Sequence, residues 1–243
     1  MKIQIVNPNT SAPMTAKIAA AARTAAAPGI EIEASCPEHG PVSIEGHFDE
    51  AMAVPGLLEE IERGVATGCD AHVIACFGDP GLHAARELAH GPVLGIAEAA
   101  MHAASMIATR FSVVTTLERT VVIAERLVRE YGMSDHCARI RAAEVPVLAL
   151  EETGSHAERR IVEECRRARD EDRAGAIVLG CAGMADLAGR IGDELGVPVI
   201  DGVNVAVRFA GALAGAGLGT SKHGDLALPL PKAFIGRYAG WSA

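Results

Sequence analysis

The strongest constraint on the fold is that the second part of the chain repeats the first. Four segments recur in the same order, 105 to 109 residues later. The pairs are KIQIVNPNT with FSVVTTLER, GIEIEA with CARIRA, HVIACFG with IVLGCAG, and GPVLGIAEAA with VPVIDGVNVA. Each match is weak alone, because apolar strands resemble one another. Together they indicate an internal duplication, and 243 residues are enough for two such units.

Within each repeat, short β-rich runs alternate with helical patterns. Strands are expected at 2–6, 30–34, 71–76, 92–96, 111–116, 138–144, 176–181 and 197–201. Helices are expected at 11–26, 52–64, 81–90, 97–109, 118–131, 155–172, 184–195 and 203–215. Strands separated by helices favour parallel sheets that are covered on both faces. We therefore expect an α/β protein with two similar domains, related by a pseudo-twofold axis, and a cleft between them.

Composition excludes several classes of protein. Hydrophobic residues make up 49% of the chain, which favours a globular fold over disorder. The net charge is −9 and no dense basic stretch occurs, which argues against binding to nucleic acid or to an anionic membrane. No apolar run is long enough to span a membrane, and the start, MKIQIVNPNT, is unlike a signal peptide. We expect a cytoplasmic protein.

The six cysteines show no CxxC pair, so neither a zinc ribbon nor a thioredoxin-type site is indicated. Cys36 and His39 would supply at most half of a structural metal site, which needs four ligands, and a polar turn is expected there. In a reducing cytoplasm the thiols would stay free. We therefore expect no metal. The cysteines are Cys36, Cys69, Cys76, Cys137, Cys165 and Cys181.

Cys76 and Cys181 occupy equivalent positions in the two repeats, each at the end of a buried strand and before a helix. A lone cysteine at such a place would be interpreted as a packing residue. A matched pair favours a shared reactive role, because functional residues gather at the carboxyl ends of parallel strands. A disulfide is the alternative, and a reducing compartment disfavours it.

Two facing thiols suit the transfer of a proton from one face of a carbon to the other. One cysteine, as thiolate, would remove a proton α to a carbonyl, and the other would return one. We expect the helix that follows each cysteine to lower its pKa, and backbone N–H groups to hold a developing enolate oxygen. Gly78, Ala182 and Gly183 are small enough for a substrate to approach the backbone. Asp79, before Pro80, is expected to be a helix N-cap, with direct ligand contact as the alternative.

These residues resemble the aspartate/glutamate/hydantoin racemase superfamily. The NPNT turn, the segment ACFGDPGL with GIAEAA after it, and LGCAGM are similar to its hydantoin and allantoin racemase branch, over nearly the whole chain. The resemblance implies two α/β domains with the active site between them, no cofactor, and a homo-oligomer. It also implies that the C-terminal segment returns to the first domain. The domains would then be 1–98 plus 208–243, carrying Cys76, and 99–207, carrying Cys181.

Carried over residue by residue, the resemblance places the acid/base pair on Cys76 and Cys181. The implied activity is racemisation of a 5-substituted hydantoin-type cyclic ureide, either a hydantoin or allantoin. Thr115 and Thr116 are also ordinary β-formers at a strand end, so their role as ligands is less specific. Substrate contacts are expected from Asn9, Phe77, Gly78, Asp79, Thr115, Thr116, Ala182 and Gly183.

One departure concerns position 78, where this branch often has an acidic residue and this chain has Gly78. It weakens the choice of substrate but not the two-cysteine chemistry. An Asp/Glu-type amino-acid racemase and a maleate isomerase-like enzyme stay open as alternatives, although no binder for a free carboxylate and ammonium is evident. Related decarboxylases need only the second cysteine, so Cys76 argues against that activity.

Other classes of function receive less support. Pyridoxal phosphate chemistry needs a lysine, and none of the four lysines lies in a convincing active-site loop. No GxGxxG follows the first strand, which argues against a nucleotide-binding enzyme. A small-ligand binder without chemistry stays possible, although binding alone does not need paired thiols.

Overall fold

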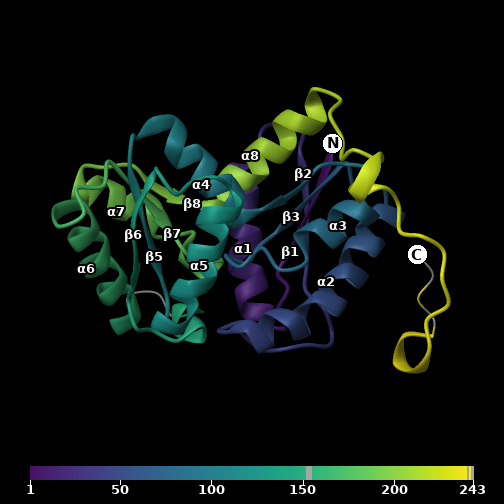
Figure 1. Cartoon of the computed structure of the whole chain (residues 1–243). Helices are drawn as coiled ribbons and strands as arrows, with labels where there is room; N and C mark the ends of the chain where they lie inside the picture. The colour runs from purple at the N-terminus through teal and green to yellow at the C-terminus, as the bar shows by residue number, and fades with distance from the viewer. Residues whose placement is uncertain (152–154, 240, 242–243) are drawn as a thin grey trace.

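The computed structural model describes residues 1–151, 155–239 and 241, and shows two parallel four-stranded sheets side by side, with helices around them (Figure 1). In the first sheet every neighbouring pair of strands is parallel, in the order β2-β1-β3-β4. The fully buried strand AHVI is apolar apart from His72, as expected where helices cover both faces. The strands are β1 (Lys2–Val6), β2 (Glu31–Ser35), β3 (Ala71–Ile74) and β4 (Val93–Gly95).

The second sheet has the same topology, in the order β6-β5-β7-β8, and is also parallel throughout. Each of its strands therefore occupies the place of its sequence counterpart in the first sheet, which supports the duplication. The strands are β5 (Phe111–Thr115), β6 (Cys137–Ala142), β7 (Ala176–Leu179) and β8 (Val199–Asp201). The predicted α/β fold with two similar halves is confirmed. We call the span from β1 to α4 the first repeat and the span from β5 to α8 the second repeat.

Eight helices of the described chain alternate with the strands, and two differ from the prediction. The second begins at His47, not at residue 52, and carries Pro55 in its interior. The helix predicted over 184–195 begins at Ala188, because a 3₁₀ turn, Ala182–Met184, comes first. The helices are α1 (Ala12–Ala25), α2 (His47–Ala66), α3 (Leu82–Leu88), α4 (Ile96–Ile107), α5 (Glu118–Glu130), α6 (His156–Asp170), α7 (Ala188–Leu195) and α8 (Gly202–Gly215).

Three helices join the two sheets into one body. Helix α8 packs on α1, α4 and β3, whereas α4 packs on α8 and on strands β7 and β8 of the second sheet (Figure 1). One continuous core results, and it includes Ile3 of the first sheet, Met101 of α4 and Phe111 of the second sheet, all fully buried.

The domain boundaries at 98 and 207 stay predictions. Residues 152–154, 240 and 242–243 of the predicted domains lie outside the described residues.

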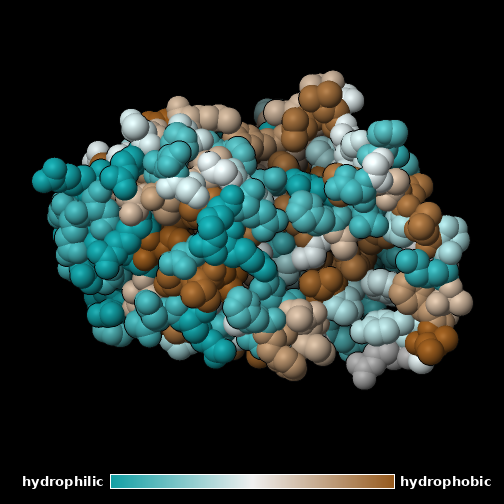
Figure 2. Space-filling view, in the orientation of Figure 1, coloured by the Kyte–Doolittle hydropathy of each residue, from teal (hydrophilic) through white to brown (hydrophobic). Residues whose placement is uncertain are grey.

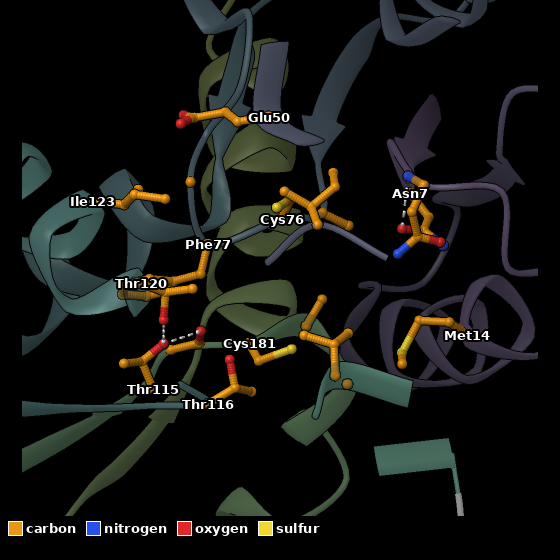
Figure 3. Close-up of a pocket in the computed structure, with 18 of the residues that line it drawn as sticks. Asn7, Met14, Glu50, Cys76, Phe77, Thr115, Thr116, Thr120, Ile123 and Cys181 are labelled. Atoms are coloured by element: carbon orange, nitrogen blue, oxygen red, sulfur yellow. Dashed lines mark hydrogen bonds between the residues drawn. The ribbon is translucent and has the colours of Figure 1, made fainter. Parts of the chain in front are cut away.

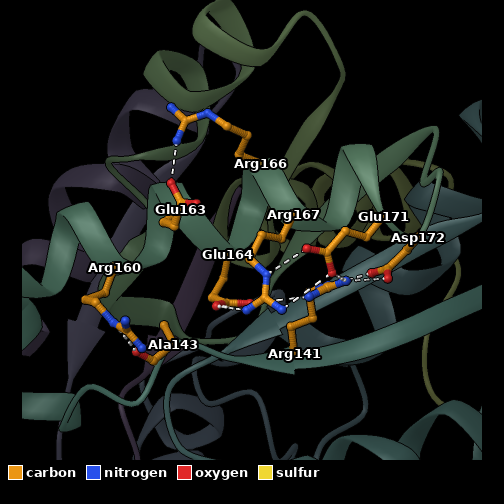
Figure 4. Close-up of polar contacts among 9 residues, drawn as sticks. All are labelled: Arg141, Ala143, Arg160, Glu163, Glu164, Arg166, Arg167, Glu171 and Asp172. Carbon is orange, nitrogen blue, oxygen red and sulfur yellow. Dashed lines mark hydrogen bonds and ion pairs between the residues drawn. The ribbon is translucent and has the colours of Figure 1, made fainter.

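A buried arginine anchors the edge strand β6 to the end of α6 (Figure 4). The guanidinium of Arg141 donates two hydrogen bonds to Asp172, at 2.6 and 2.7 Å, and one to Glu171 at 2.8 Å. Glu164 lies 3.6 Å away, and the Ser112 hydroxyl donates to Asp172 at 2.9 Å. A buried charge is stable only when it is paired and hydrogen-bonded, and this network satisfies that condition.

The surface is mostly polar, with an apolar C-terminal segment along one edge (Figure 2). Thr220 and Lys222 bind the main chain near α3, through the carbonyls of Gly91 and of Arg86 and Glu87. Beyond them Leu230 and Ile235 are exposed.

Within the described part of the chain, every helix is too short or too polar to cross a membrane.

Candidate active site

A cavity lies where the carboxyl ends of the two sheets face each other. Cys76 follows β3 and Cys181 follows β7, each two residues beyond the strand, and the two side chains lie on opposite walls (Figure 3). The volume of the cavity, about 60 Å³, suits a small molecule. The duplicated strands thus bring together two thiols that are 105 residues apart in the sequence.

Each thiol lies in a turn that is closed by a main-chain hydrogen bond to the carbonyl of the cysteine. In the first repeat the N–H of Asp79 binds the carbonyl of Cys76 at 3.0 Å, and in the second the N–H of Met184 binds the carbonyl of Cys181 at 3.1 Å. Inside each turn a main-chain N–H, from Gly78 or Gly183 respectively, donates to the sulfur. Such a hydrogen bond favours the thiolate.

Burial acts in the opposite direction and is the larger effect. It raises the pKa of Cys76 far above the ordinary thiol value and the pKa of Cys181 to about 11. The expected lowering of the pKa by the following helices is therefore wrong. Helix α3 begins only at Leu82 and α7 at Ala188, whereas the helix dipole acts within the first turn. At neutral pH both shifts favour the protonated thiol.

The two thiols differ in their charged neighbours. Near Cys76 the carboxylates of Asp79 and Glu50 raise the pKa further. Near Cys181 the ammonium of Lys17 lowers the pKa by more than the carboxylate of Glu45 raises it. A single negative charge on the pair is therefore more stable on Cys181 than on Cys76. Lys17 is held by the carbonyl of Leu150 at 2.7 Å and by Asp186 at 3.0 Å.

The NPNT turn supplies the polar end of the cavity. Asn9 uses its side-chain oxygen to accept from Asn7 at 2.8 Å and from the N–H of Ser11 at 2.9 Å. Its amide nitrogen has no protein partner in the described part of the chain and is free to donate to a ligand. Asn7 also lines the cavity, which the sequence analysis missed, although its place in the same turn was a usable signal.

The two threonines at the end of β5 both line the cavity, but they differ in whether the hydroxyl group is free to bind a ligand. The Thr115 hydroxyl bonds with Thr120 at 3.1 Å and donates to the carbonyl of Gly180 at 3.3 Å (Figure 3). The Thr116 hydroxyl has no hydrogen bond to another described residue, so of the two it is the better ligand group. Phe77, Gly78, Ala182 and Gly183 also line the cavity, as predicted.

Asp79 has a different place from the one predicted. Its side chain does not line the cavity, and the N-cap of α3 is Gly81, not Asp79. The carboxylate instead accepts from the N–H groups of Ala97 and Glu98, at the start of α4, and from the Tyr131 hydroxyl. Its oxygens are occupied by these donors, so the assignment of Asp79 as a substrate contact is withdrawn.

The rest of the lining is apolar, apart from one carboxylate. Glu50 of α2 lies at the rim and pairs with Arg126 of α5 at 2.7 Å. Among the described residues that line the cavity, none is Lys, Arg or His, and Glu50 is the one with a charge. No sequence signal singled out Glu50, because its position depends on the long-range packing of α2. The apolar wall is formed by Met14, Ile18, Ile44, Ile123 and Val147.

No metal site accompanies the cavity. Over residues 1–151, 155–239 and 241, no three or more His, Cys, Asp or Glu side chains are grouped so as to hold a metal ion. The lining also offers no lysine for a Schiff base. Independence from cofactors stays a prediction.

Comparison with known sequences places the chain in a family. The sequence profile of the Asp/Glu/hydantoin racemase family matches residues 3–210. The chain belongs to this family. A hydantoin racemase of Rhizobium meliloti is 53% identical over 236 residues, which cover 97% of this chain and 98% of that protein. The resemblance noted in the sequence is thus confirmed.

Solved structures support the same assignment. An allantoin racemase from Klebsiella pneumoniae has a TM-score of 0.97 and 59% identity, over 99% of this chain and 98% of that one. An allantoin racemase from Pseudomonas fluorescens has a TM-score of 0.92 and 41% identity, over 97% and 100% of the two chains. Arylmalonate decarboxylase, at 18% identity and a TM-score of 0.63, shares the fold.

Proposed function

We propose that this protein is a cofactor-independent racemase of a 5-substituted hydantoin-type cyclic ureide, and that Cys76 and Cys181 are its two acid/base groups. One observation carries the proposal: two thiols at equivalent positions of a duplicated fold lie on opposite walls of one small cavity. The relatives named hydantoin racemase and allantoin racemase, similar over almost the full chain, support the substrate class.

The reaction needs one thiolate and one thiol. With the charge on Cys181, this sulfur takes the proton from C5 of one enantiomer, and Cys76 delivers its proton to the opposite face. The reverse direction begins with the charge on Cys76. Between the two transfers, negative charge lies on the ring carbonyl next to C5. The N–H groups that follow the cysteines and the amide of Asn9 are the donors for this oxygen.

Charge distinguishes the possible substrates. The cavity has no cationic side chain among its described lining residues, whereas Glu50 contributes a negative charge at the rim. A free carboxylate would lose its hydration without gaining a partner, which is unfavourable. A neutral ring with amide N–H and C=O groups instead matches Asn9 and Thr116. This favours a ureide over aspartate, glutamate, maleate or a malonate.

A panel of substrates tests the proposal. Single enantiomers of 5-benzylhydantoin, 5-methylhydantoin and allantoin are incubated with the protein, beside L-aspartate, L-glutamate and maleate. We expect loss of optical rotation for at least one of the ureides only, after correction for spontaneous racemisation. The control is Cys36→Ser, which removes a thiol outside the cavity and should keep full activity. Turnover of aspartate or maleate, without turnover of any ureide, would contradict the proposal and favour the alternative activities.

A small-ligand binder is the remaining alternative. It predicts that the ureides bind, as seen by calorimetry, without loss of rotation and without exchange of the C5 hydrogen. We also infer that the protein acts as a homo-oligomer in the cytoplasm, does not bind nucleic acid or membranes, and needs no cofactor. Light scattering tests the first of these inferences, and activity after EDTA treatment and dialysis tests the last.

A further inference from the structure

The two cysteine turns are attached to the protein differently, although the same main-chain hydrogen bond closes each of them. In the first repeat the turn ends in Asp79, and in the second the matching position is Met184, which is fully buried in the core. Asp79 reaches the N-terminus of α4 with its carboxylate, accepting from Ala97 at 3.1 Å and from Glu98 at 2.9 Å. Met184 has no polar group with which to make such contacts.

The second repeat caps the equivalent helix from another position. There Asp201, at the end of β8, accepts from the N–H of Asn204 at 3.0 Å and caps its own helix, α8. The matching position in the first repeat is Gly95. A Cβ atom on Gly95 would lie 2.1 Å from the carboxyl carbon of Asp79, so the absence of a side chain there makes room for that carboxylate. A carboxylate thus caps α4 in the first repeat and α8 in the second, but only the one at α4 comes from a cysteine turn.

Two further features show that Asp79 is held under constraint. Its φ is +44°, a left-handed conformation that is unfavourable for a residue other than glycine and persists only when surrounding contacts enforce it. The Tyr131 hydroxyl donates to the same carboxylate at 2.7 Å, and Tyr131 follows α5, in the second repeat. The turn of Cys76 is therefore attached to α4 and also to the opposite side of the cavity.

We propose that Asp79 is a positioning residue for Cys76 alone, which holds the Cys76 turn against α4 and, through Tyr131, against the second repeat. The inference rests on the proposed acid/base function of the cysteines. The side chain of Asp79 lies outside the cavity and does not touch the sulfur of Cys76. Its charge raises the pKa of Cys76, and its hydrogen bonds hold the turn that carries this cysteine. Loss of the Tyr131 contact should misplace Cys76 relative to C5 and leave Cys181 in place.

The experiment separates the two thiols by their half-reactions. Cys181→Ser leaves Cys76 as the one abstracting thiol of the pair, and Cys76→Ser leaves Cys181. Tyr131→Phe, which removes only the hydroxyl, is added to each of these variants. Exchange of the C5 hydrogen in D₂O is then followed by NMR for each enantiomer of a 5-substituted hydantoin. We expect Tyr131→Phe to slow exchange about tenfold in the Cys181→Ser protein and to leave exchange in the Cys76→Ser protein unchanged.

A matched control and a second readout complete the test. Asp201 caps α8 and does not belong to a cysteine turn. The variant Asp201→Asn should therefore affect both half-reactions equally or not at all. The relative rate at which iodoacetamide labels Cys76 and Cys181, measured by mass spectrometry, should change with Tyr131→Phe, which keeps the Asp79 carboxyl group, but not with Asp201→Asn. This readout needs no substrate, so it tests the inference even if no ureide is turned over.

Equal slowing of both half-reactions by Tyr131→Phe, together with an unchanged labelling ratio, would overturn the inference. Asp79 would then be a helix cap without a role in positioning. If the labelling ratio changes while wild-type protein turns over no ureide, the positioning role stands and the proposed function fails.

Discussion

The hydroxyl of Tyr131 donates a 2.7 Å hydrogen bond to the carboxylate of Asp79, and this bond joins the end of α5 to the turn that carries Cys76. The carboxylate is buried, which raises the pKa of Asp79 to about 7. The three donors around it offset part of this effect, because they favour the ionised form. The turn that carries Cys76 is thus joined to the second repeat by a contact between Asp79 and Tyr131.

Gly95→Ala tests the space that this carboxylate occupies. The added methyl group would lie 2.1 Å from the carboxyl carbon of Asp79, so the carboxylate must leave the N-terminus of α4. We expect a loss of about 1–3 kcal/mol in the free energy of unfolding, measured in urea. Gly189→Ala is the matched control. Nothing lies within 4 Å of the Cβ added in that helix, so the change should be neutral or slightly stabilising. Equal stability of the Gly95→Ala variant and the wild type would contradict the assigned geometry.

Arg141→Met tests the buried ion network at β6. The change leaves Asp172 buried without its guanidinium partner, which costs about 3–5 kcal/mol of stability, whereas Glu164 keeps its pair with Arg167. Chemical denaturation measures the loss as a lower midpoint. Arg166→Met serves as the control, since Arg166 forms exposed pairs with Glu163 and Glu194, and its loss should cost under about 1 kcal/mol. Similar losses in both variants would show that the Arg141 network contributes no more than a surface pair.

Lys17→Met tests the charge next to Cys181. The Lys17 ammonium lowers the pKa of Cys181, so its removal should raise this pKa. At a given pH a thiol with a higher pKa forms less thiolate. The pH profile for labelling of Cys181 by iodoacetamide should therefore move to higher pH, and racemisation at neutral pH should fall.

Cys76 provides an internal comparison for this prediction, because Lys17 is not among the groups that shift its pKa. Its labelling profile should stay in place. Lys2→Met removes an ammonium that pairs with Glu33 at 3.4 Å, outside the cavity, and should change neither profile. A Cys181 profile that does not move in Lys17→Met would show that the lysine has no electrostatic role at the site.

Local patterns were sufficient for the parts of the structure that depend on neighbouring residues. The duplicated segments predicted two sheets of equal topology, and the strand ends placed Cys76 and Cys181 at one cavity. The partners of Asp79 were not predictable in this way. Its carboxylate binds the start of α4 and, 52 positions along the chain, Tyr131, and such contacts follow from packing between elements.

The direction of the thiol pKa shifts was also missed, for a related reason. A sequence shows that a helix follows each cysteine, but it does not show how completely the closed cavity removes the sulfur from water. Glu50 illustrates the same limit. It lies on a helix that begins five residues earlier than predicted, and it reaches the cavity because α2 packs beside the Cys76 turn.

Glu50→Gln tests whether the rim carboxylate excludes anions. The substitution keeps the size of the side chain and removes its charge, so an anionic ureide such as hydantoin-5-acetate should bind better. We expect its KM to fall severalfold while the KM of a neutral 5-alkylhydantoin changes little. In Glu50→Gln the guanidinium of Arg126 loses its ion-pair partner and could itself attract the anion. The variant Arg126→Gln is therefore measured in parallel. An unchanged KM for the anionic substrate in Glu50→Gln would remove the electrostatic argument for neutral substrates.

The two cysteines should divide the reaction by enantiomer. Replacement of either by serine leaves a hydroxyl that is far too weak as a base at neutral pH, so racemisation should fall by at least about a thousandfold in both single variants. Each remaining thiol still faces one side of C5. In D₂O each variant should therefore exchange the C5 hydrogen of a different enantiomer without inverting it, which NMR and chiral chromatography together detect. The double variant gives the spontaneous background. Near wild-type racemisation of both enantiomers by Cys76→Ser would make Cys76 a packing residue, and the two-base mechanism proposed for this protein would be wrong.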